Sequence, residues 1–441
     1  MKKSTLLCLL LLPALMLFLH ACGEDRTIEY RDRTEMNSWL YRTFSENYLF
    51  NTSLAAESSL PTYATPENYI TRLISSSENR NGEAVSCLFY GAVPLPLTYG
   101  LDYDFHSGDS TSYLRVLHVN PGSPAEEAGL KRGDWIVRID GVPVTSSNSS
   151  ILEETDEART HTLTLAQLND TLHGEPILTE TTTLQLSIPR SLAASPVEKD
   201  TVFEVEGKRI GYLLLTNFET DANRSEDFYG EYANQVRTTI NRLASQNIED
   251  LVLDLRFAYG HSLNLPYLLG SMLAPAETFG QPFYFLIQNE LRGADISLLT
   301  SSLVAEGAQL LLPRLYALVS RRTLGGGEML IHCLKPYMNV TVIGEKTVGY
   351  DLQSEIFHNE TYGYGLQLVT GEIYNADTTS YSGGITPDVL LEEQDTLLLD
   401  MHPLGNPEEL LLKRAVRSIL YNFGDKDGIE LPDTAAQRKE D

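Results

Sequence analysis

Cysteine is scarce in this sequence, which has four in 441 residues. Cys8 and Cys22 lie near the N-terminus, so only Cys87 and Cys333 remain, far apart in the chain. Two such cysteines do not make a disulfide framework. Cys333 lies in an apolar helical run, where a small buried thiol is the ordinary occupant. Its neighbour His332 projects from a different side of a helix, so we do not expect a thiol nucleophile.

Basic residues are also scarce, because 33 Lys and Arg stand against 60 Asp and Glu, for a formal net charge of −27. A chain with this negative charge repels the phosphates of nucleic acid, so no nucleic-acid partner is expected. The acidic residues are scattered, which is typical of a solvated surface. The sequence lacks a His/Cys cluster with metal-ligand spacing and a Gly-rich phosphate loop, so we expect no metal and no cofactor.

Long hydrophobic runs are limited to one, residues 6–19, which follows Lys2 and Lys3. This run is shorter than the roughly 20 residues that a membrane-spanning helix needs. The segment Leu19-His20-Ala21-Cys22 fits a bacterial lipoprotein cleavage box. We therefore expect residues 1–22 to be a lipoprotein signal peptide and Cys22 to carry the lipid; the alternative is a transmembrane anchor.

A lipidated Cys22 predicts the location of the protein. We expect it in the cell envelope of a Gram-negative bacterium, attached through its lipid anchor to the outer membrane. Glu24 and Asp25 directly follow the lipidated cysteine. In some Gram-negative bacteria acidic residues at these positions accompany display on the outer surface, so they are a hint of surface exposure.

After the signal, residues 23–92 are predicted to form a helical domain. Met36, Leu40, Phe44 and Tyr48 recur at helical spacing. Thr65-Pro66-Glu67-Asn68 places a capping residue before a proline at the first helical position, which predicts a second helix. The aromatic residues of this region are core candidates.

Residues 93–195 have a different character. Residues 113–119 alternate like a strand, residues 120–130 form a turn, a short helix and a glycine stop, and residues 131–141 form a turn, a strand and a glycine turn. The passage GSPAEEAGLKRGDWIVRIDG (residues 122–141) closely resembles a PDZ domain of the bacterial protease type. We expect residues 181–188 to be its closing strand.

The PDZ resemblance implies peptide binding, because these domains add an extended peptide to a sheet edge. The matching loop is residues 99–103, with Gly100, Leu101 and Tyr103 as the expected peptide-binding residues. Asp102 places a negative charge where a terminal carboxylate would bind, which argues against strong C-terminal recognition. A PDZ domain that only packs on its neighbour stays open as the alternative.

Residues 200–400 alternate between strand and helix patterns, which predicts an α/β fold with a sheet covered by helices. Residues 209–215 and 250–256 are apolar strands, and residues 328–334 are helical. Residues 401–441 are predicted to hold a C-terminal helix, from about residue 406 to 421, and a polar tail.

The order of helical segment, PDZ and α/β core resembles the S41 peptidases, the tail-specific or C-terminal processing proteases. The segments that carry the resemblance are RIGYLLLTNF (209–218), DLVLDLR (250–256), residues 321–350, and GGITPD (383–388). It covers nearly the whole chain after the signal. It implies a ClpP/crotonase-like core and a Ser–Lys dyad in which a neutral lysine takes the serine proton.

The residues of that dyad are absent. In the family the nucleophile precedes by three residues a Glu that begins a helix; Glu328 fixes this register and puts Gly325 in the serine position. The lysine usually follows a glycine, and here Tyr350 follows Gly349. The oxyanion segment is changed as well.

The family pattern Asp-Leu-Arg-x-Asn-x-Gly-Gly is matched by residues 254–261, where Ala258 replaces the Asn and His261 follows Gly260 in place of the second glycine. The vestigial catalytic positions are therefore Gly325, Tyr350, Gly260 and His261. Tyr350 is a poor base because tyrosine has a pKa near 10.

Three glycines, Gly325, Gly326 and Gly327, precede a predicted helix, and their free N–H groups predict an anion-binding nest for a peptide carboxylate or carbonyl. A flexible turn without a ligand is the alternative. The candidates for a relocated nucleophile are Ser320 and Ser262, the latter beside His261.

The sequence thus predicts a lipid-anchored S41 homologue that has lost hydrolysis and binds or scaffolds extracytoplasmic polypeptides or envelope proteins through its PDZ domain and vestigial cleft. Two alternatives stay open. One is an active S41-type serine endopeptidase with a relocated nucleophile, and the other is a structural partner of an active paralogue.

Overall fold

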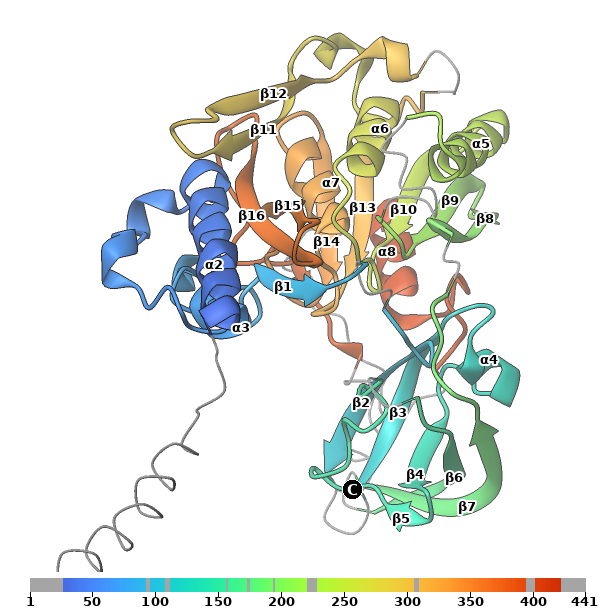
Figure 1. The fold of residues 1–441 in the computed structure, drawn as a ribbon. Coiled ribbons are helices and arrows are strands. Elements are labelled where there is room, and N and C mark those ends of the chain that lie inside the picture. Colours follow the sequence, from blue (N-terminus) through green and yellow to red (C-terminus); the bar gives the residue numbers. More distant parts are fainter. Residues whose placement is uncertain are drawn as a thin grey trace, which may run out of the picture.

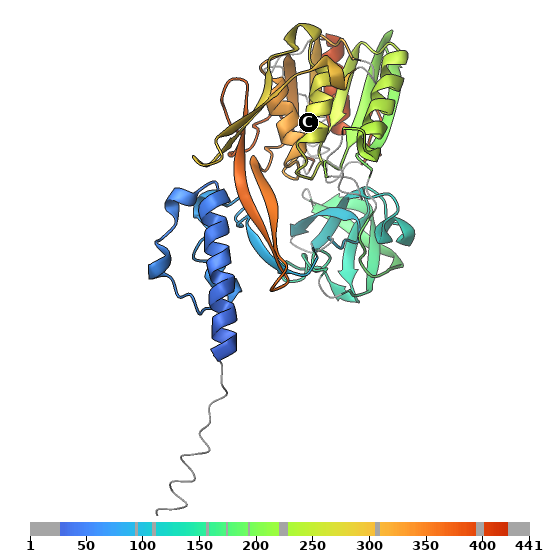
Figure 2. The same cartoon turned by 45° about the horizontal axis from the view of Figure 1, so that its top comes forward.

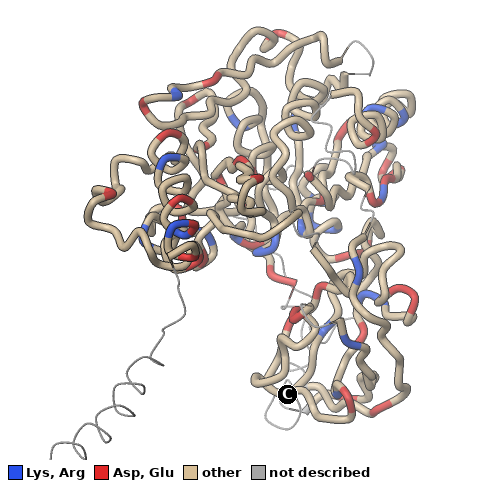
Figure 3. Tube along the Cα trace, viewed as in Figure 1, with Lys and Arg blue, Asp and Glu red and all other residues tan. Residues whose placement is uncertain are grey.

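A computed structural model describes residues 27–421 except 93–95, 108–111, 156–157, 173–174, 193–194, 220–227, 305–308 and 394–400. The expected signal peptide, the lipidation site Cys22 and the polar tail after residue 421 lie outside the described residues. Within the described part, no helix is long and apolar enough to cross a membrane. Along the backbone of the described residues, Asp and Glu positions are spread over all parts of the molecule (Figure 3).

The N-terminal part is helical, as the sequence predicts. It comprises α2 (Thr27–Asn47), α3 (Pro66–Ile70) and the short turns η1 (Asn51–Ser53), η2 (Glu57–Ser59) and η3 (Ser76–Glu78). The Thr65 side chain accepts a hydrogen bond from the Asn68 N–H and Pro66 opens α3, so the expected cap is confirmed. The apolar stripe of α2, which includes Met36, Leu40 and Phe44, is fully buried.

The apolar stripe of α2 packs on strands from far along the sequence. Its hydrophobic cluster includes Leu352, Leu366 and Leu368 of β15 (Leu352–Asn359) and β16 (Tyr364–Asn375). The strand β1 (Cys87–Tyr90) pairs with β16. The helical part therefore shares a core with the second half of the chain, where the sequence predicted a separate domain. Figure 2 shows the β15–β16 ribbon reaching between the helical part and the β-rich part.

The β-rich part corresponds to the predicted PDZ region. Its strands and helix are β2 (Leu101–Ser107), β3 (Ser112–Val119), α4 (Pro124–Ala128), β4 (Trp135–Ile139), β5 (Val142–Pro143), β6 (His161–Leu172) and β7 (Glu175–Leu186). The sheet order is β2-β3-β4-β6-β7, so β2 lies at an edge. The Ser123 hydroxyl caps α4, and Gly129 ends it with φ 90°. The closing strand β7 begins six residues earlier than expected.

The α/β core is built on a six-stranded sheet in the order β17-β14-β13-β10-β9-β8. The strands are β8 (Val197–Val205), β9 (Lys208–Leu215), β10 (Asp250–Asp254), β13 (Arg314–Val319), β14 (Asn339–Gly344) and β17 (Val389–Leu390). All neighbours pair in parallel except β8 with β9. The five residues of β10 are all buried, as expected of a central parallel strand.

Helices cover both faces of this sheet. One face packs against α5 (Glu231–Ser245), α6 (Asn264–Leu273) and α7 (Gly326–Leu334), and the other packs against α8 (Leu410–Tyr421). The C-terminal helix is therefore part of the core (Figure 1). A second, antiparallel sheet contains β1, β15, β16, β11 (Pro282–Gln288) and β12 (Ala294–Leu298), with the turns η4 (Ala276–Thr278) and η5 (Ser301–Leu303) nearby in sequence.

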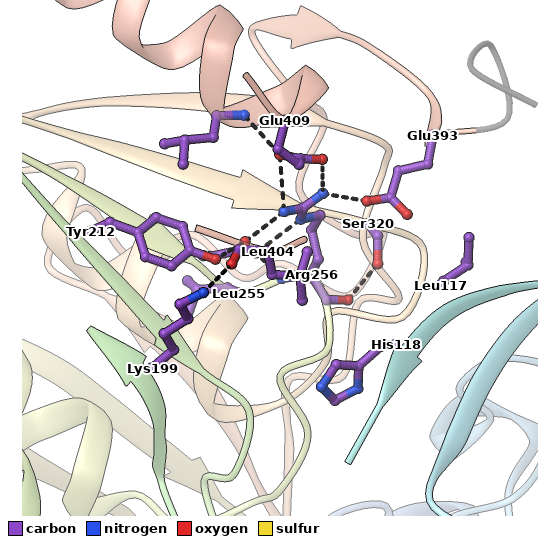
Figure 4. A network of polar contacts seen from close by, with 12 residues as sticks. Leu117, His118, Lys199, Tyr212, Leu255, Arg256, Ser320, Glu393, Leu404 and Glu409 are labelled. Atoms are coloured by element: carbon purple, nitrogen blue, oxygen red, sulfur yellow. Dashed lines mark hydrogen bonds and ion pairs between the residues drawn. The ribbon is translucent and has the colours of Figure 1, made fainter. Parts of the chain in front are cut away.

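Buried charges join the β-rich part to the core. Arg256, directly after β10, is fully buried and pairs with Asp254 (2.6 Å), Glu409 (2.8 Å) and Glu393. Arg132 reaches from the β3–β4 connection to the same Glu393 (3.0 Å) and Glu409 (3.2 Å). Figure 4 shows Arg256 between the two glutamates. Burial alone would raise the pKa of Glu393, but the two arginines hold it at about 2.

Candidate functional site

Gly325 lies at the sharp turn between β13 and α7, with φ 60° and ψ −114°. This backbone region is strained for any residue with a side chain. A Cβ atom built on Gly325 would lie 2.2 Å from the Gly260 carbonyl oxygen and 2.9 Å from His261 Nδ1. The space that a nucleophilic side chain needs is therefore filled by the Gly260 backbone and the His261 ring.

The three glycines do not present free amide groups. The Gly326 N–H donates to the Gly260 carbonyl (2.9 Å), and the Gly325 N–H donates to Glu328 Oε2 (3.1 Å). Gly325, Gly326 and Gly327 are all buried. The prediction of three unencumbered N–H groups is wrong, because a carbonyl and a carboxylate already occupy two of them at the first turn of α7.

Glu328 is the centre of this hydrogen bonding. Its fully buried carboxylate accepts from the N–H groups of Gly325 (3.1 Å), Gly349 (2.6 Å) and Tyr350 (2.8 Å) and from the Thr347 hydroxyl. Burial raises the pKa of Glu328 to about 7, although these hydrogen bonds act to lower it. The sequence showed Glu328 only as a register mark; nothing in it indicated four donors, three of them from a loop about twenty residues later.

Tyr350 and His261 stack on one another beside Gly325, with ring centroids 4.1 Å apart and an interplanar angle of 28°. The structure thus brings the four predicted vestigial positions, Gly325, Gly260, His261 and Tyr350, into one place. Burial raises the pKa of Tyr350 well above its usual value, so its hydroxyl stays protonated and is a poor general base.

His261 is half-buried, and its Nδ1 atom is shielded from water. Burial lowers the pKa of His261 to about 4, so the ring is neutral at pH 7. Within the described part of the chain, its Nδ1 atom has no hydrogen-bond partner. The backbone N–H of His261 bonds to the Glu219 carboxyl group, whose pKa is raised by burial. A neutral imidazole without an adjacent hydroxyl cannot activate a serine.

The serines proposed as relocated nucleophiles have structural contacts. The Ser320 side chain is buried; its hydroxyl donates to the Arg256 carbonyl (2.5 Å) and accepts from the Arg322 N–H (3.1 Å). Ser262 accepts a hydrogen bond from the Asn264 N–H (3.2 Å) at the start of α6. Both hydroxyls serve local turns, and neither is paired with the His261 ring nitrogens.

The expected peptide-binding residues lie at and beside the edge strand β2. A Cβ atom on Gly100 would lie 2.1 Å from Ser123 Cβ, so only glycine fits there. Tyr103 is buried, and its hydroxyl donates to the Ser149 carbonyl (2.9 Å). Leu101 is half-buried and packs at the side of the apolar cluster of this domain. Of these residues, Leu101 offers the most apolar surface to a ligand.

Two arginines from the loop before Gly325 contact this edge strand. Arg322 donates to the Tyr103 carbonyl (2.6 Å) and to Asp104 Oδ1 (2.5 Å), and Arg321 also pairs with Asp104. Asp102, which the sequence analysis expected to lie near the terminal carboxylate of a bound peptide, pairs with His118 (3.1 Å). The loop that leads to Gly325 is therefore in direct contact with the edge strand β2.

No grouping of three or more His, Cys, Asp or Glu side chains suited to a metal ion occurs in the described ranges.

Comparison with known proteins gives the same organisation. Residues 209–391 match Peptidase family S41, and residues 115–165 match the PDZ domain. Among solved structures, the chain is similar to an S41 family protein from Bacteroides fragilis NCTC 9343, with a TM-score of 0.72 and 28% identity over 86% of this chain and 96% of that one.

Two curated relatives are carboxyl-terminal-processing proteases. That of Synechocystis sp. is 26% identical over 319 residues, which is 72% of this chain and 67% of the relative. That of Picosynechococcus sp. is 25% identical over 264 residues, which is 58% of this chain and 56% of the relative. The matches therefore span between about half and two thirds of these relatives. The predicted fold class, a mixed α/β S41 core with a PDZ β-domain and an N-terminal helical segment, is confirmed.

Proposed function

We propose that this chain, an S41-family core joined to a PDZ domain, binds extracytoplasmic polypeptides without hydrolysing them. The observation that carries the proposal is the occupied nucleophile position. The Gly260 carbonyl lies where a side chain on Gly325 would begin, and the same carbonyl accepts the Gly326 N–H. An oxyanion site needs free donors at the start of this helix.

Loss of the Ser–Lys dyad is expected to remove most of the rate of peptide hydrolysis. When a nucleophile and its base act as a unit, removing them costs on the order of 10⁶-fold in the rate of a serine protease of another family. Gly325 supplies no oxygen, and the Tyr350 hydroxyl stays protonated because burial raises its pKa. Peptide binding does not depend on either group, because it would use the PDZ strand β2.

The ligand class follows from the relatives and the fold. Relatives named carboxyl-terminal-processing proteases point to the C-terminal segments of polypeptides. PDZ domains bind such segments as an added strand. Asp102 pairs with His118, which also pairs with Glu198, and lies 3.8 Å from Arg322; these contacts support this ligand, since they partly neutralise the charge that would repel a terminal carboxylate.

We place the protein in the envelope, held by lipid on Cys22. The sequence Leu19-His20-Ala21-Cys22 supports this placement. Metabolic labelling with a clickable fatty acid tests it. Label should enter the wild-type protein and be lost in Cys22→Ala; label in both variants would exclude lipidation at Cys22.

Two measurements on the purified protein test the proposed function. A fluorescent unstructured peptide with a free C-terminus should bind saturably, and a Leu101→Asp variant on β2 should bind it more weakly. A serine-reactive phosphonate probe should label neither Ser262 nor Ser320. Labelling of either serine, with activity lost on its mutation to alanine, would establish the active peptidase instead.

A further inference from the structure

The antiparallel sheet has an open, apolar edge at β12, far from the PDZ domain (Figure 1). Within the described part of the chain, the only strand beside β12 in the sheet is β11. Four of its five residues, Ala294, Asp295, Ile296 and Leu298, are exposed. Edge strands are usually protected by lysine, proline, a bulge or a covering segment; β12 has neither lysine nor proline, and the bulge in its pairing with β11 lies at one end, between Pro282 and Tyr284.

The outward face of this edge is apolar. Phe285 lies opposite Ile296, and Ile287 lies opposite Ala294, so these side chains share one face of the hairpin. Ile287, Ile296 and Leu298 are 38%, 57% and 45% exposed. Neither strand places a charged residue on this face. The other face carries Tyr284 and packs on the core.

We propose that this edge is the interface of a homodimer, in which β12 pairs antiparallel with β12 of a second copy about a two-fold axis at Ile296. An interface of this kind uses the same patch on both copies, so the strand must be complementary to itself. Pairing about Ile296 places Ile296 opposite Ile296 of the second copy and Ala294 opposite Leu298 on the apolar face.

The other face, on which β12 carries Asp295 and Ser297, fits the same register. Asp295 lies opposite Ser297 of the second copy, so a carboxylate meets a hydroxyl. A shift that centred the pair on Asp295 would set two carboxylates opposite each other, which is destabilising. The Leu298 carbonyl already accepts a hydrogen bond from the Tyr267 hydroxyl (2.5 Å). The stretch of β12 whose backbone groups can pair with a second copy therefore ends at Leu298.

Net charge favours this site over others on the surface. Each copy carries a formal charge of −27, so two copies repel over most of their surface. The apolar face of β11 and β12 is a strip where two copies can approach without placing like charges together. This association does not involve the PDZ strand β2, and it does not depend on the proposed function.

Sedimentation velocity over a wide concentration range tests the dimer. We expect the wild-type chain to dimerise, and Ile296→Lys to weaken the dimer about tenfold or more, because it sets two ammonium groups together at the axis. Leu311→Lys is the matched control: Leu311 is 76% exposed and lies outside the hairpin, so this variant should dimerise like wild type.

Cysteine cross-linking tests the register. In a Cys87→Ser background, Ile296→Cys should form an intermolecular disulfide under mild oxidation, because residues at the axis come within the Cα separation that a disulfide needs. Ser297→Cys should not, since its partner is Asp295. A wild-type monomer at all concentrations, a dimer unaffected by Ile296→Lys, or a monomer whose edge binds only an added peptide would each overturn the proposal.

Discussion

Gly325 keeps the backbone of a sharp strand-to-helix turn while the space for a side chain is filled by its neighbours. His261 contributes to this packing, because its ring lies against Gly325 and stacks on Tyr350. A single Gly325→Ser substitution is therefore not expected to give a working nucleophile. A serine at position 325 would meet the Gly260 carbonyl before it could meet a substrate.

We expect Gly325→Ser to destabilise the protein by about 2 kcal/mol or more, from backbone strain and the clash with Gly260, and to leave it without peptidase activity. Urea denaturation measures the change. The matched control is Gly383→Ser, because a Cβ atom on Gly383 meets nothing within 4 Å and its backbone has no positive φ. A Gly325→Ser variant as stable as the control would contradict the described packing.

Glu328 is predicted to make stability depend on pH. Its folded pKa of about 7 lies above the usual 4.5, so the folded chain holds a proton that the unfolded chain releases between these values. Its contribution to stability is therefore full at low pH and falls as the pH rises toward 7. Relative to Glu328→Gln, the wild type should lose on the order of 3 kcal/mol across this window.

Urea denaturation of both proteins at several pH values measures this difference. Parallel curves for wild type and Glu328→Gln would rule out titration of Glu328 in this window. If Glu328→Gln does not fold, Thr347→Val serves instead. It removes a hydroxyl that lowers the pKa of Glu328, so the fall in stability should begin at the same pH and extend to higher pH than in the wild type.

At the scale of elements, the loop between β13 and α7 links the vestigial site to β2. Arg322 donates a hydrogen bond to the Tyr103 carbonyl, which is a backbone acceptor of the strand to which a peptide would add. Arg321 contacts only the side chains of Asp104 and Glu345 among the pairs described. Substituting each arginine in turn therefore separates the effect of the hydrogen bond to the Tyr103 carbonyl from the effect of losing one positive charge.

We expect Arg322→Ala to bind a C-terminal peptide several-fold more tightly than wild type, because it frees the edge of β2. Fluorescence anisotropy gives the affinity, and circular dichroism checks the fold. Arg321→Ala removes the same charge without releasing the strand and should bind like wild type. Equal affinities for the two variants would mean that the Tyr103 contact does not limit binding.

At the scale of the whole molecule, the Arg132 contacts tie the PDZ domain to the core. The Arg132 side chain is 9% exposed and pairs with two buried glutamates, Glu393 and Glu409. Removing one partner of a buried pair leaves an uncompensated charge, at a cost of about 3–5 kcal/mol. An exposed pair contributes about 0–1 kcal/mol.

Arg132→Ala should therefore lower the free energy of unfolding by about 3 kcal/mol and separate the calorimetric unfolding of the PDZ domain from that of the core. The control is Arg138→Ala, which breaks the exposed pair with Glu180. It should change stability by less than about 1 kcal/mol. A single unfolding transition in both variants would show that the domains are coupled by other contacts.

The elements and the position of the site could be predicted from the sequence on different grounds. Periodicity indicates the strands and helices, and the resemblance to the S41 peptidases, with Glu328 as the register mark, implied that Gly325, Gly260, His261 and Tyr350 lie together. What closes the site could not be predicted. The Gly260 carbonyl contact, the four donors to Glu328 and the Arg322 contact join residues that only the tertiary fold brings together.

The central claim is that this chain binds polypeptides without cutting them, and mass spectrometry of a bound peptide tests it most directly. An unstructured peptide with a free C-terminus is incubated with excess purified protein for a prolonged time. We predict that the intact mass persists, as it does in buffer without the protein. New C-terminal or internal fragments that require the wild-type protein, and that disappear on mutation of a residue in this cleft, would contradict the account.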